Sequence, residues 1–377
     1  MRSPACFITR NFPPLTGGME RLNYQAFLAL SSEYSVALCG PQGAEAYLEN
    51  VRYITEVPPN PLSRFLIACQ WQSLVLARRV KPELIYSGSG VTAPAALMAA
   101  SVVKARSVCF LHGLDIVADH PVYKALFLPA IRRMDGILVN SAHTASLAED
   151  AGISSQRIHI VHPGVSLPPI SERTTANWRF RQRLGLSNQP ILLAAGRLTQ
   201  RKGIAEFIRH ALPEICNNIP DLVFLVIGDE PKNALNHRAG VEIGIRDAIH
   251  NSKMDSHVKL LGSVDDASLS DAYFSANALV FPVLDLPGDV EGFGMVAVEA
   301  AAHGLPTVAF AVGGVPDAVA DGRSGWLVSP GDYSLMAERL VSLLRSEGNA
   351  EMSSFSRRHA EEFSWERFGM RLRSAVR

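Results

Sequence analysis

The feature that most constrains the fold of this 377-residue chain is a repeated alternation of short apolar runs with longer amphipathic stretches. Such alternation is typical of parallel sheets flanked by helices. A segment over 163–177, with three prolines and several turn-forming residues, divides the alternation into two series and predicts a linker. At about 150 residues per domain the length also predicts two domains. The expected fold class is α/β, with two parallel-sheet domains facing a central cleft.

Thirteen strands are expected, seven before the linker and six after it. The first series comprises 6–9, 36–39, 52–57, 84–86, 108–111, 137–140 and 158–161. The second comprises 191–195, 223–227, 258–261, 279–282, 307–310 and 325–328. Ligands of such sheets bind in crevices at the carboxyl ends of the strands. The loops that follow these strands therefore contain the candidate site residues.

Charge and cysteine content exclude several classes of protein. Lys plus Arg and Asp plus Glu number 36 each, which disfavours a dedicated nucleic-acid-binding protein. The five cysteines include no CxxC pair and no close Cys/His set, so neither a disulfide framework nor a zinc site is expected. The longest apolar run, 91–103, is well short of the ~20 residues of a membrane span. A cytoplasmic protein is expected, at most peripheral to the inner face of the membrane.

Two glycine-containing loops in the first series are candidates for phosphate binding. Gly17 and Gly18 follow the first strand and precede a helix, so their backbone could approach a phosphate at a helix N-terminus; an ordinary strand-to-helix turn is the alternative. The segment 88–93 matches the dinucleotide fingerprint GxGxxA, but the next strand ends at His112 without an acidic residue for a ribose. A nicotinamide oxidoreductase is therefore the weaker interpretation.

Polar residues at two other strand ends suggest contacts with an anionic substrate. His112 follows the strand 108–111, where its ring or backbone could bind a polar substrate. Arg197 and Lys202 follow the strand 191–195 and together suit a diphosphate. Arg201, between them, is expected to be merely solvated.

The strongest signal is the block over 291–306, EGFGMVAVEAAAHGLP. Gly292 and Gly294 free the backbone at an expected helix start, where amides can face an anion. Glu291 is expected in the loop before that helix. Glu299 is expected within it, among apolar residues that require a hydroxyl or cationic partner for its carboxylate.

Together these motifs resemble the large retaining glycosyltransferase family 4, which has the GT-B fold of two Rossmann-like domains. The resemblance rests on the Gly-Gly loop, His112-Gly113, GRLTQRKG over 196–203, the Glu-x7-Glu block and FSWERF over 363–368. The stretch PGDVEGFG over 287–294 is similar to lipid-directed bacterial mannosyltransferases. The fold implies an acceptor-side domain over 1–168, a nucleotide-sugar domain over 169–362 and a terminal helix over 363–377 that returns to the first domain.

The resemblance implies a role for each candidate residue. Arg197 and Lys202 would bind the donor diphosphate, Glu299 the ribose hydroxyls, and His112 the transferred sugar. Gly17 and Gly18 would close over the phosphates. The sugar and the distal phosphate would be contacted by Glu291 and by the backbone of Gly292, Phe293, Gly294, Met295 and Val296. The nucleobase would lie beside Gly262 to Val264. The family's usual Gly-x-Gly-Pro is replaced by GDEP over 228–231, a departure that leaves Asp229 and Glu230 expected in solvent.

The predicted function is retaining, metal-independent transfer of a hexose from a nucleotide-diphosphate sugar such as GDP-mannose. The two cations and helix-start amides stabilise the leaving diphosphate, and neither a metal nor a cofactor is expected. The predicted acceptor is lipid-linked or a polysaccharide in cell-surface glycan synthesis. Basic clusters in the first domain suit anionic lipid headgroups, although solvated helix ends explain them equally well. The alternatives are a sugar-nucleotide epimerase of the same fold, a nicotinamide oxidoreductase, or a non-catalytic nucleotide-sugar sensor.

Overall fold

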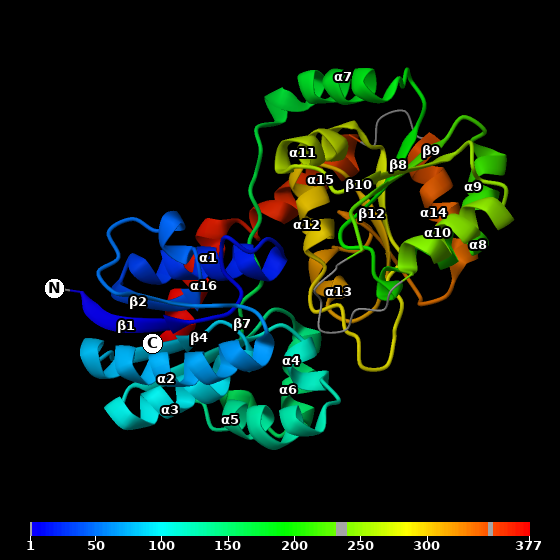
Figure 1. The fold of residues 1–377 in the computed structure, drawn as a ribbon. Helices are drawn as coiled ribbons and strands as arrows, with labels where there is room; N and C mark the ends of the chain where they lie inside the picture. The colour runs from blue at the N-terminus through cyan, green and yellow to red at the C-terminus, as the bar shows by residue number, and fades with distance from the viewer. Residues whose placement is uncertain (1, 231–239, 346–349) are drawn as a thin grey trace. The chain divides into compact units, whose positions relative to one another are not determined.

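The computed structural model describes residues 2–230, 240–345 and 350–377, which form two compact units (Figure 1). Unit 1 comprises Met1–Gly164 and Trp365–Arg377, and unit 2 comprises Val165–Ser364. The backbone amide of Val165 donates to the carbonyl of Phe363 at 2.7 Å, so unit 2 begins and ends at adjacent positions. The structure divides the chain after residues 164 and 364. The sequence predicts divisions after residues 168 and 362, slightly later and slightly earlier in the chain.

Unit 1 contains a seven-stranded parallel sheet in the order β3-β2-β1-β4-β5-β6-β7. Its strands are β1 Ser3–Ile8, β2 Tyr34–Pro41, β3 Ile54–Val57, β4 Leu84–Ser87, β5 Arg106–Leu111, β6 Gly136–Val139 and β7 Ile158–Ile160. Its helices are α1 Gly18–Ser31, α2 Leu62–Val80, α3 Ala93–Val103, α4 Leu114–Val117, α5 Leu128–Arg132, α6 Ala142–Asp150 and α16 Trp365–Val376, with short turns η1 Ala44–Tyr47, η2 Gly90–Thr92, η3 Tyr123–Phe127 and η4 Ser155–Arg157. Chain order reverses between β1 and β4, so the loops after these two strands diverge.

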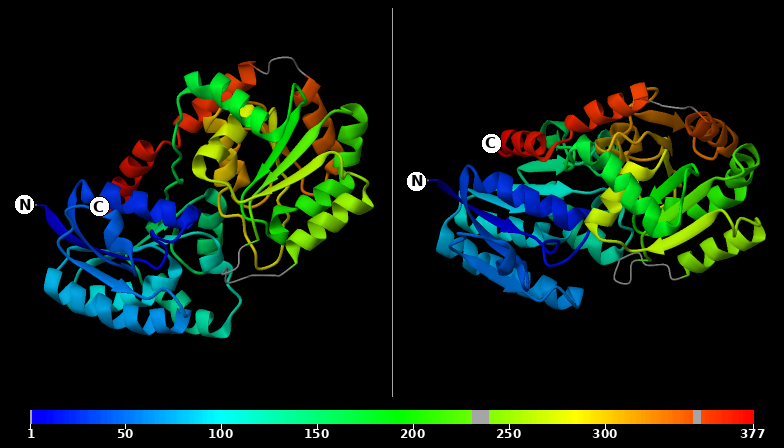
Figure 2. Two further views of the ribbon diagram at one scale, coloured as in Figure 1. Left: turned by 45° about the horizontal axis from the view of Figure 1, so that its top comes forward. Right: turned by 90° about the horizontal axis from the view of Figure 1, so that it is seen from above.

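Helices cover both faces of this sheet, and each face has its own apolar core. Helices α1 and α16 lie side by side on one face, blue and red in Figures 1 and 2, and enclose Phe7, Tyr86 and Phe368. Helices α2 and α3 cover the other face and enclose Phe65 and Ile85. The last helix of the chain thus completes the core of the first unit.

Unit 2 contains a six-stranded parallel sheet in the order β10-β9-β8-β11-β12-β13. Its strands are β8 Ile191–Ala195, β9 Val223–Ile227, β10 Val258–Gly262, β11 Ala278–Phe281, β12 Thr307–Phe310 and β13 Gly325–Val328. Its helices are α7 Arg173–Leu184, α8 Ile204–His210, α9 Leu212–Asn218, α10 Val241–Asn251, α11 Asp266–Ser275, α12 Met295–Ala302, α13 Val315–Ala318, α14 Tyr333–Arg345 and α15 Ala350–Glu361, with short turns η5 Ile170–Glu172 and η6 Gln200–Lys202. Here the chain order reverses between β8 and β11.

All thirteen strands expected from the sequence are present, and only their ends differ. The third begins at Ile54 rather than at residue 52. Most strand residues are buried because helices cover both faces of each sheet. Strands buried on both faces have nearly continuous apolar sequences, which explains why they are easily located.

The predicted linker is wrong over its last five residues, because helix α7 begins at Arg173. Thr174, Thr175 and Asn177 are weak helix formers, but tertiary contacts override their preferences. Ala176 and Phe180, one turn apart, are buried, and Phe180 belongs to an apolar cluster of unit 2. The guanidinium of Arg173 also donates to the carbonyl of His303 at 2.7 Å.

Candidate active site

Two loops meet at the chain-order reversal of the unit 2 sheet. One follows β8 and spans 196–203, and the other follows β11 and spans 282–294 before helix α12. Because β8 and β11 are neighbours whose connections leave in opposite directions, a crevice opens beyond their carboxyl ends. The strongest motifs in the sequence therefore lie at the position where sheets of this kind bind ligands.

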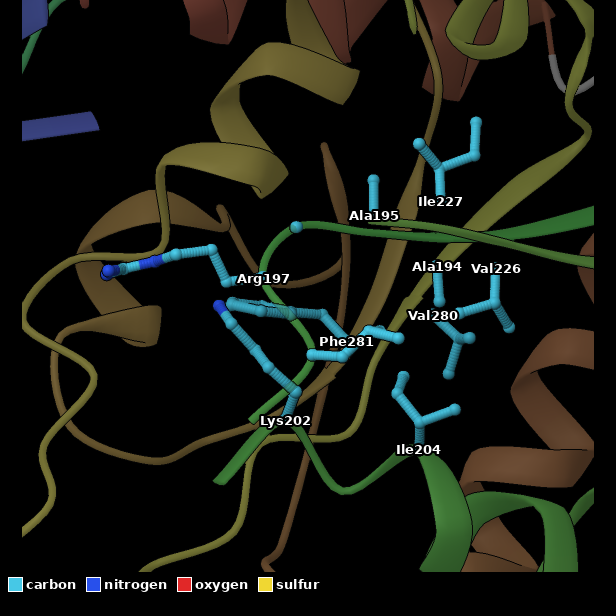
Figure 3. Close-up of a pocket in the computed structure, with 11 residues that line it drawn as sticks. Ala194, Ala195, Arg197, Lys202, Ile204, Val226, Ile227, Val280 and Phe281 are labelled. Atoms are coloured by element: carbon cyan, nitrogen blue, oxygen red, sulfur yellow. The ribbon is translucent and has the colours of Figure 1, made fainter. Parts of the chain in front are cut away.

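Gly203 allows the two loops to touch. It has φ 66°, and a Cβ there would lie 2.0 Å from the carbonyl oxygen of Pro282. Any other residue would force the loops apart. Lys202 and Arg197 line a pocket at this point, and the Phe281 ring lies between their side chains in Figure 3.

The two predicted diphosphate-binding residues have different environments. The Arg197 side chain is exposed and points away from the apolar side chains of the strands (Figure 3). Lys202 is largely buried, with its Nζ 4.5 Å from the centroid of the Phe281 ring. Of the two cations, only Arg197 therefore has an exposed side chain.

An ion-pair network joins the two loops. Lys202 Nζ donates to Glu291 Oε2 at 2.8 Å, and Arg201 Nη1 donates to the same oxygen. Arg201 Nε donates to Asp289 Oδ1 at 3.0 Å. The Arg201 side chain is only 9% exposed, so the prediction that it is merely solvated is wrong. It is the residue that ties the loop after β8 to both Asp289 and Glu291 of the loop after β11.

The ion-pair network keeps the carboxylate of Glu291 ionised. Burial alone would raise the pKa of Glu291, but Lys202 and Arg201 outweigh it and lower this pKa to about 2. Burial lowers the pKa of Lys202, an effect that Glu291 opposes. Two cations and two carboxylates balance within the network, and exposed Arg197 adds positive charge beside it. The crevice edge therefore favours an anionic ligand.

Helix α12 begins where the glycines of the block 291–306 predict. Gly294, its N-cap, has φ 98°, a conformation that favours glycine. The preceding residue, Phe293, places its ring in the core beside Phe363, so a ligand would meet only its backbone. Met295 and Val296 form the half-buried first turn of the helix.

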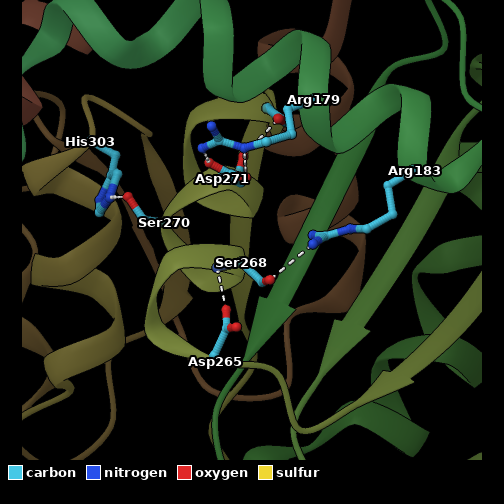
Figure 4. Close-up of polar contacts among 8 residues, drawn as sticks. Arg179, Arg183, Asp265, Ser268, Ser270, Asp271 and His303 are labelled. Atoms are coloured by element: carbon cyan, nitrogen blue, oxygen red, sulfur yellow. Dashed lines mark hydrogen bonds and ion pairs between the residues drawn. The ribbon is translucent and has the colours of Figure 1, made fainter.

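Glu299 lies within α12 and has the kind of partner that the sequence predicts. Its half-buried carboxylate accepts a hydrogen bond from the hydroxyl of Tyr273 in α11 at 3.2 Å. The carbonyl of Glu299 lies 2.7 Å from His303 Nδ1, and His303 Nε2 lies 2.8 Å from Ser270 Oγ (Figure 4). The same figure shows Arg179 of α7 paired with Asp271 of α11. Tyr273 has no signal in the sequence alone, because a tyrosine within an amphipathic helix is usually a core residue.

His303 is uncharged near neutral pH. Burial lowers its pKa from 6.5 to about 4, and the hydrogen bond to the Glu299 carbonyl only partly opposes this. Between these values the unfolded chain binds a proton that the folded chain does not, so stability falls as pH falls through this window. We expect a loss of about 3 kcal/mol. His303→Asn, which keeps an N–H donor without titrating, should remove this loss when urea unfolding is compared at pH 7 and pH 4; an unchanged loss would contradict the assignment.

The proposed nucleobase segment begins at Gly262, the last residue of β10. Gly262 has φ 66°, and its carbonyl accepts from the amide of Gly228 at 2.9 Å. Val264 is half-buried against the core of the same unit. In the neighbouring loop Asp229 is exposed, whereas Glu230 is half-buried and accepts from the amide of Gly240 at 2.8 Å at the start of α10. Pro231 lies outside the described residues.

In unit 1 the predicted residues lie at the carboxyl edge of the sheet. Gly17 and Gly18 are exposed at the start of α1. Half-buried His112 follows β5, with its Nε2 3.0 Å from the carbonyl of Gly88. The buried carboxylate of Asp115, whose pKa burial raises, accepts from the His112 amide at 2.9 Å. Asp115 thus positions the loop that holds His112.

The glycine segment 88–93 is packed rather than open. A Cβ on Gly88 would lie 2.5 Å from Asn23 Oδ1 and 2.6 Å from Thr9 Oγ1. One on Gly90 would lie 2.4 Å from the Tyr123 hydroxyl. Neighbouring side chains therefore pack closely against both glycines, and this packing accounts for their lack of a side chain without a dinucleotide.

The described residues contain neither a metal-binding cluster nor a membrane-spanning helix. Among residues 2–230, 240–345 and 350–377, no three His, Cys, Asp or Glu side chains group in a way that could hold a metal ion. No helix in this described part of the chain is long and apolar enough to cross a membrane.

Comparison with protein families matches both parts of the chain. Residues 16–167 match the model described as Glycosyltransferase Family 4, and residues 189–346 match that described as Glycosyl transferases group 1. The chain is 28% identical to the GDP-mannose-dependent alpha-(1-6)-phosphatidylinositol monomannoside mannosyltransferase of Mycolicibacterium smegmatis, over 97% of this chain and 96% of the relative. It is 33% identical to the D-inositol 3-phosphate glycosyltransferase of Xylanimonas cellulosilytica, over 60% of this chain and 53% of that relative.

Solved structures share the fold. HepE of Anabaena in complex with UDP and glucose superposes with a TM-score of 0.78 at 18% identity, over 99% of each chain. Sucrose-phosphate synthase of Thermosynechococcus elongatus gives a TM-score of 0.78 at 19% identity, over 99% of this chain and 98% of that chain. With two parallel-sheet units, a crevice-edge cation network and matches to both domain models, the chain belongs to glycosyltransferase family 4 and has the GT-B fold.

Proposed function

We propose that this glycosyltransferase transfers a hexose from a nucleotide-diphosphate sugar, with GDP-mannose as the donor, to a lipid-linked or polysaccharide acceptor. The observation that carries the proposal is the Lys202–Glu291–Arg201 network beside Arg197 at the chain-order reversal of unit 2. The choice of GDP-mannose is supported by relatives that are named GDP-mannose-dependent mannosyltransferases and match 97% of this chain.

The charges of this site suit loss of a diphosphate without a metal ion. Arg197 and Lys202 would bind the diphosphate, and backbone amides from Gly292 to Val296 would face the charge that grows as it leaves. Glu291 would accept hydrogen bonds from the sugar hydroxyls with the carboxylate oxygen that Arg201 and Lys202 leave free. We propose retention of anomeric configuration by same-face displacement, assisted by the leaving phosphate.

The remaining candidate residues complete this proposal. Glu299 would accept hydrogen bonds from the ribose hydroxyls, and Gly262 to Val264 would lie beside the nucleobase. In unit 1, Gly17 and Gly18 would bind donor phosphates and His112 would contact the transferred sugar. Trapping a sugar ester on any Asp or Glu side chain would contradict the same-face displacement.

A thermal-shift panel tests the donor assignment. GDP at ~100 times its dissociation constant adds about 2.7 kcal/mol of stability, which should raise the melting temperature by several degrees. UDP, ADP and NADH at the same concentration should give little shift. Transfer of mannose from GDP-mannose to a phosphatidylinositol mannoside or a polysaccharide acceptor then identifies the reaction. A response to UDP alone would overturn the choice of GDP-mannose.

The ribose role of Glu299 gives a separate prediction. Glu299→Gln removes the charge but keeps the shape, and should raise the Kd for GDP at least tenfold, since hydrogen bonds to charged groups contribute about 1.5–3 kcal/mol. Tyr273→Phe should produce a smaller increase because the carboxylate remains. Tyr333→Phe in α14 is the matched control. An unchanged Kd for Glu299→Gln, measured by calorimetry, would remove the ribose role.

A further inference from the structure

Arg10 of unit 1 is a half-buried cation that is held by uncharged groups. It lies at the carboxyl edge of the seven-stranded sheet, two residues after the end of β1. Its Nε donates to the carbonyl of Pro59 at 3.0 Å, and its Nη2 donates to Asn60 Oδ1 at 2.9 Å. Among residues 2–230, 240–345 and 350–377, no carboxylate forms an ion pair with Arg10. Such a charge favours an anionic ligand, because removing it from water is costly unless an opposite charge compensates it.

The carboxylate of Glu20 influences Arg10 but is held by a different residue. Glu20 Oε1 accepts from Asn11 Nδ2 at 2.7 Å, and its other oxygen lies against Gly17. Burial lowers the pKa of Arg10, and Glu20 only partly opposes this effect. Glu20 therefore compensates the burial of Arg10 only in part.

The two contacts of Arg10 occupy one edge of its guanidinium and leave the other edge open. Pro59 and Asn60, in the loop after β3, bind the Nε–Nη2 edge. Both N–H groups of Nη1 and the second N–H group of Nη2 remain, and two of these lie parallel along the Nη1–Nη2 edge. This edge matches two oxygens of a phosphate in a bidentate contact. Because the other edge is fixed by a separate loop, the guanidinium is already oriented before a ligand binds.

Arg10 shares its sheet edge with His112. In the sheet, only β4 lies between β1 and β5, so the ends of these two strands are about 10 Å apart. A molecule with a hydroxyl near His112 can therefore place a second group at Arg10.

We propose that Arg10 binds the phosphate of a phosphodiester-linked acceptor and so helps to select that acceptor. The inference rests on the proposed function, in which the acceptor is either lipid-linked or a polysaccharide, and it favours the lipid-linked class. A neutral polysaccharide would leave the open edge of Arg10 without an anionic partner.

Calorimetry with a soluble lipid headgroup tests the site directly. With GDP saturating the donor site, the full chain should bind glycerophosphoinositol, should bind inorganic phosphate more weakly and should not bind glycerol. Arg10→Gln should raise the Kd for glycerophosphoinositol at least tenfold, because a charge-assisted bidentate contact is lost. Arg10→Lys keeps the charge without the planar fork and should give an intermediate Kd. Binding of inorganic phosphate without binding of glycerophosphoinositol would overturn the assignment to an acceptor.

Control variants separate this site from the donor site. Arg133→Gln removes an exposed arginine of unit 1 and should leave the Kd for glycerophosphoinositol unchanged. If GDP causes no thermal shift, the donor proposal fails, and Lys202→Met then replaces GDP as the way to remove phosphate binding at the donor site. A Kd that rises in Lys202→Met but not in Arg10→Gln would overturn the proposal.

Transfer kinetics separate acceptor binding from a structural role of Arg10. Arg10→Gln should raise the KM for a phosphatidylinositol mannoside acceptor at least tenfold and leave kcat and the KM for GDP-mannose near their wild-type values. A displaced loop would also raise the KM for GDP-mannose, because Gly17 and Gly18 follow Arg10 in that loop. An equal rise in both KM values, or no change in the Kd for glycerophosphoinositol, would overturn the proposal.

Discussion

Lys202→Met should lower the rate of hexose transfer by roughly a hundred- to a thousandfold, the usual cost of removing one group that stabilises charge in a transition state. Methionine keeps the length of the stem over Phe281 but cannot hold the leaving diphosphate. Glu291 keeps its contact with Arg201, so the melting temperature should fall by only a few degrees. Steady-state kinetics with GDP-mannose, together with thermal unfolding, measures both effects.

The exposed residue Lys259, on β10, supplies a matched control as Lys259→Met. This variant should transfer hexose at the wild-type rate. If Lys202→Met transfers hexose as fast as the wild type, Lys202 does not act on the diphosphate.

Arg201→Met should lower the free energy of unfolding of unit 2 by about 3–5 kcal/mol, because removing one partner of a buried ion pair leaves uncompensated charge. Asp289 would lose the guanidinium partner described above, and Glu291 would keep only Lys202. A solvated arginine, as the sequence suggested, would change stability by no more than about 0.5 kcal/mol. Urea unfolding followed through Trp326, which lies in unit 2, distinguishes the two values.

Arg323 is exposed in the same unit, and Arg323→Met is the control for loss of a surface arginine. Its free energy of unfolding should match that of the wild type. A loss for Arg201→Met no larger than for Arg323→Met would show that the network contributes nothing to stability.

The sequence predicts the strands of this protein well because of their burial. Strands such as Val223–Ile227, covered on both faces, are apolar throughout and bounded by turn residues. It also predicts that Glu291 precedes helix α12 and that Glu299 lies within it, because glycines mark the helix start. Features that local composition encodes can therefore be predicted from the sequence.

Features that depend on contacts between residues far apart in the sequence cannot be predicted in this way. Arg201 lies in a basic turn that looks solvated, and its burial depends on Asp289, 88 residues further along the chain. Helix α7 includes two threonines and an asparagine, yet it forms because it packs against α11 and buries Phe180 in an apolar cluster of unit 2. The hydroxyl partner of Glu299 was expected, but only the packing of α11 against α12 identifies it as Tyr273. In each case a long-range contact decides the outcome.

The return of α16 to unit 1 has a consequence for biosynthesis. Unit 2 is one continuous segment and can fold as it leaves the ribosome, whereas unit 1 lacks part of its core until residues 365–377 emerge. Until then, the apolar sites that receive Phe368, Leu372 and Val376 stay open to solvent and to other nascent chains. A stop codon before Trp365 would therefore leave unit 2 complete and make unit 1 a substrate for chaperones and proteases.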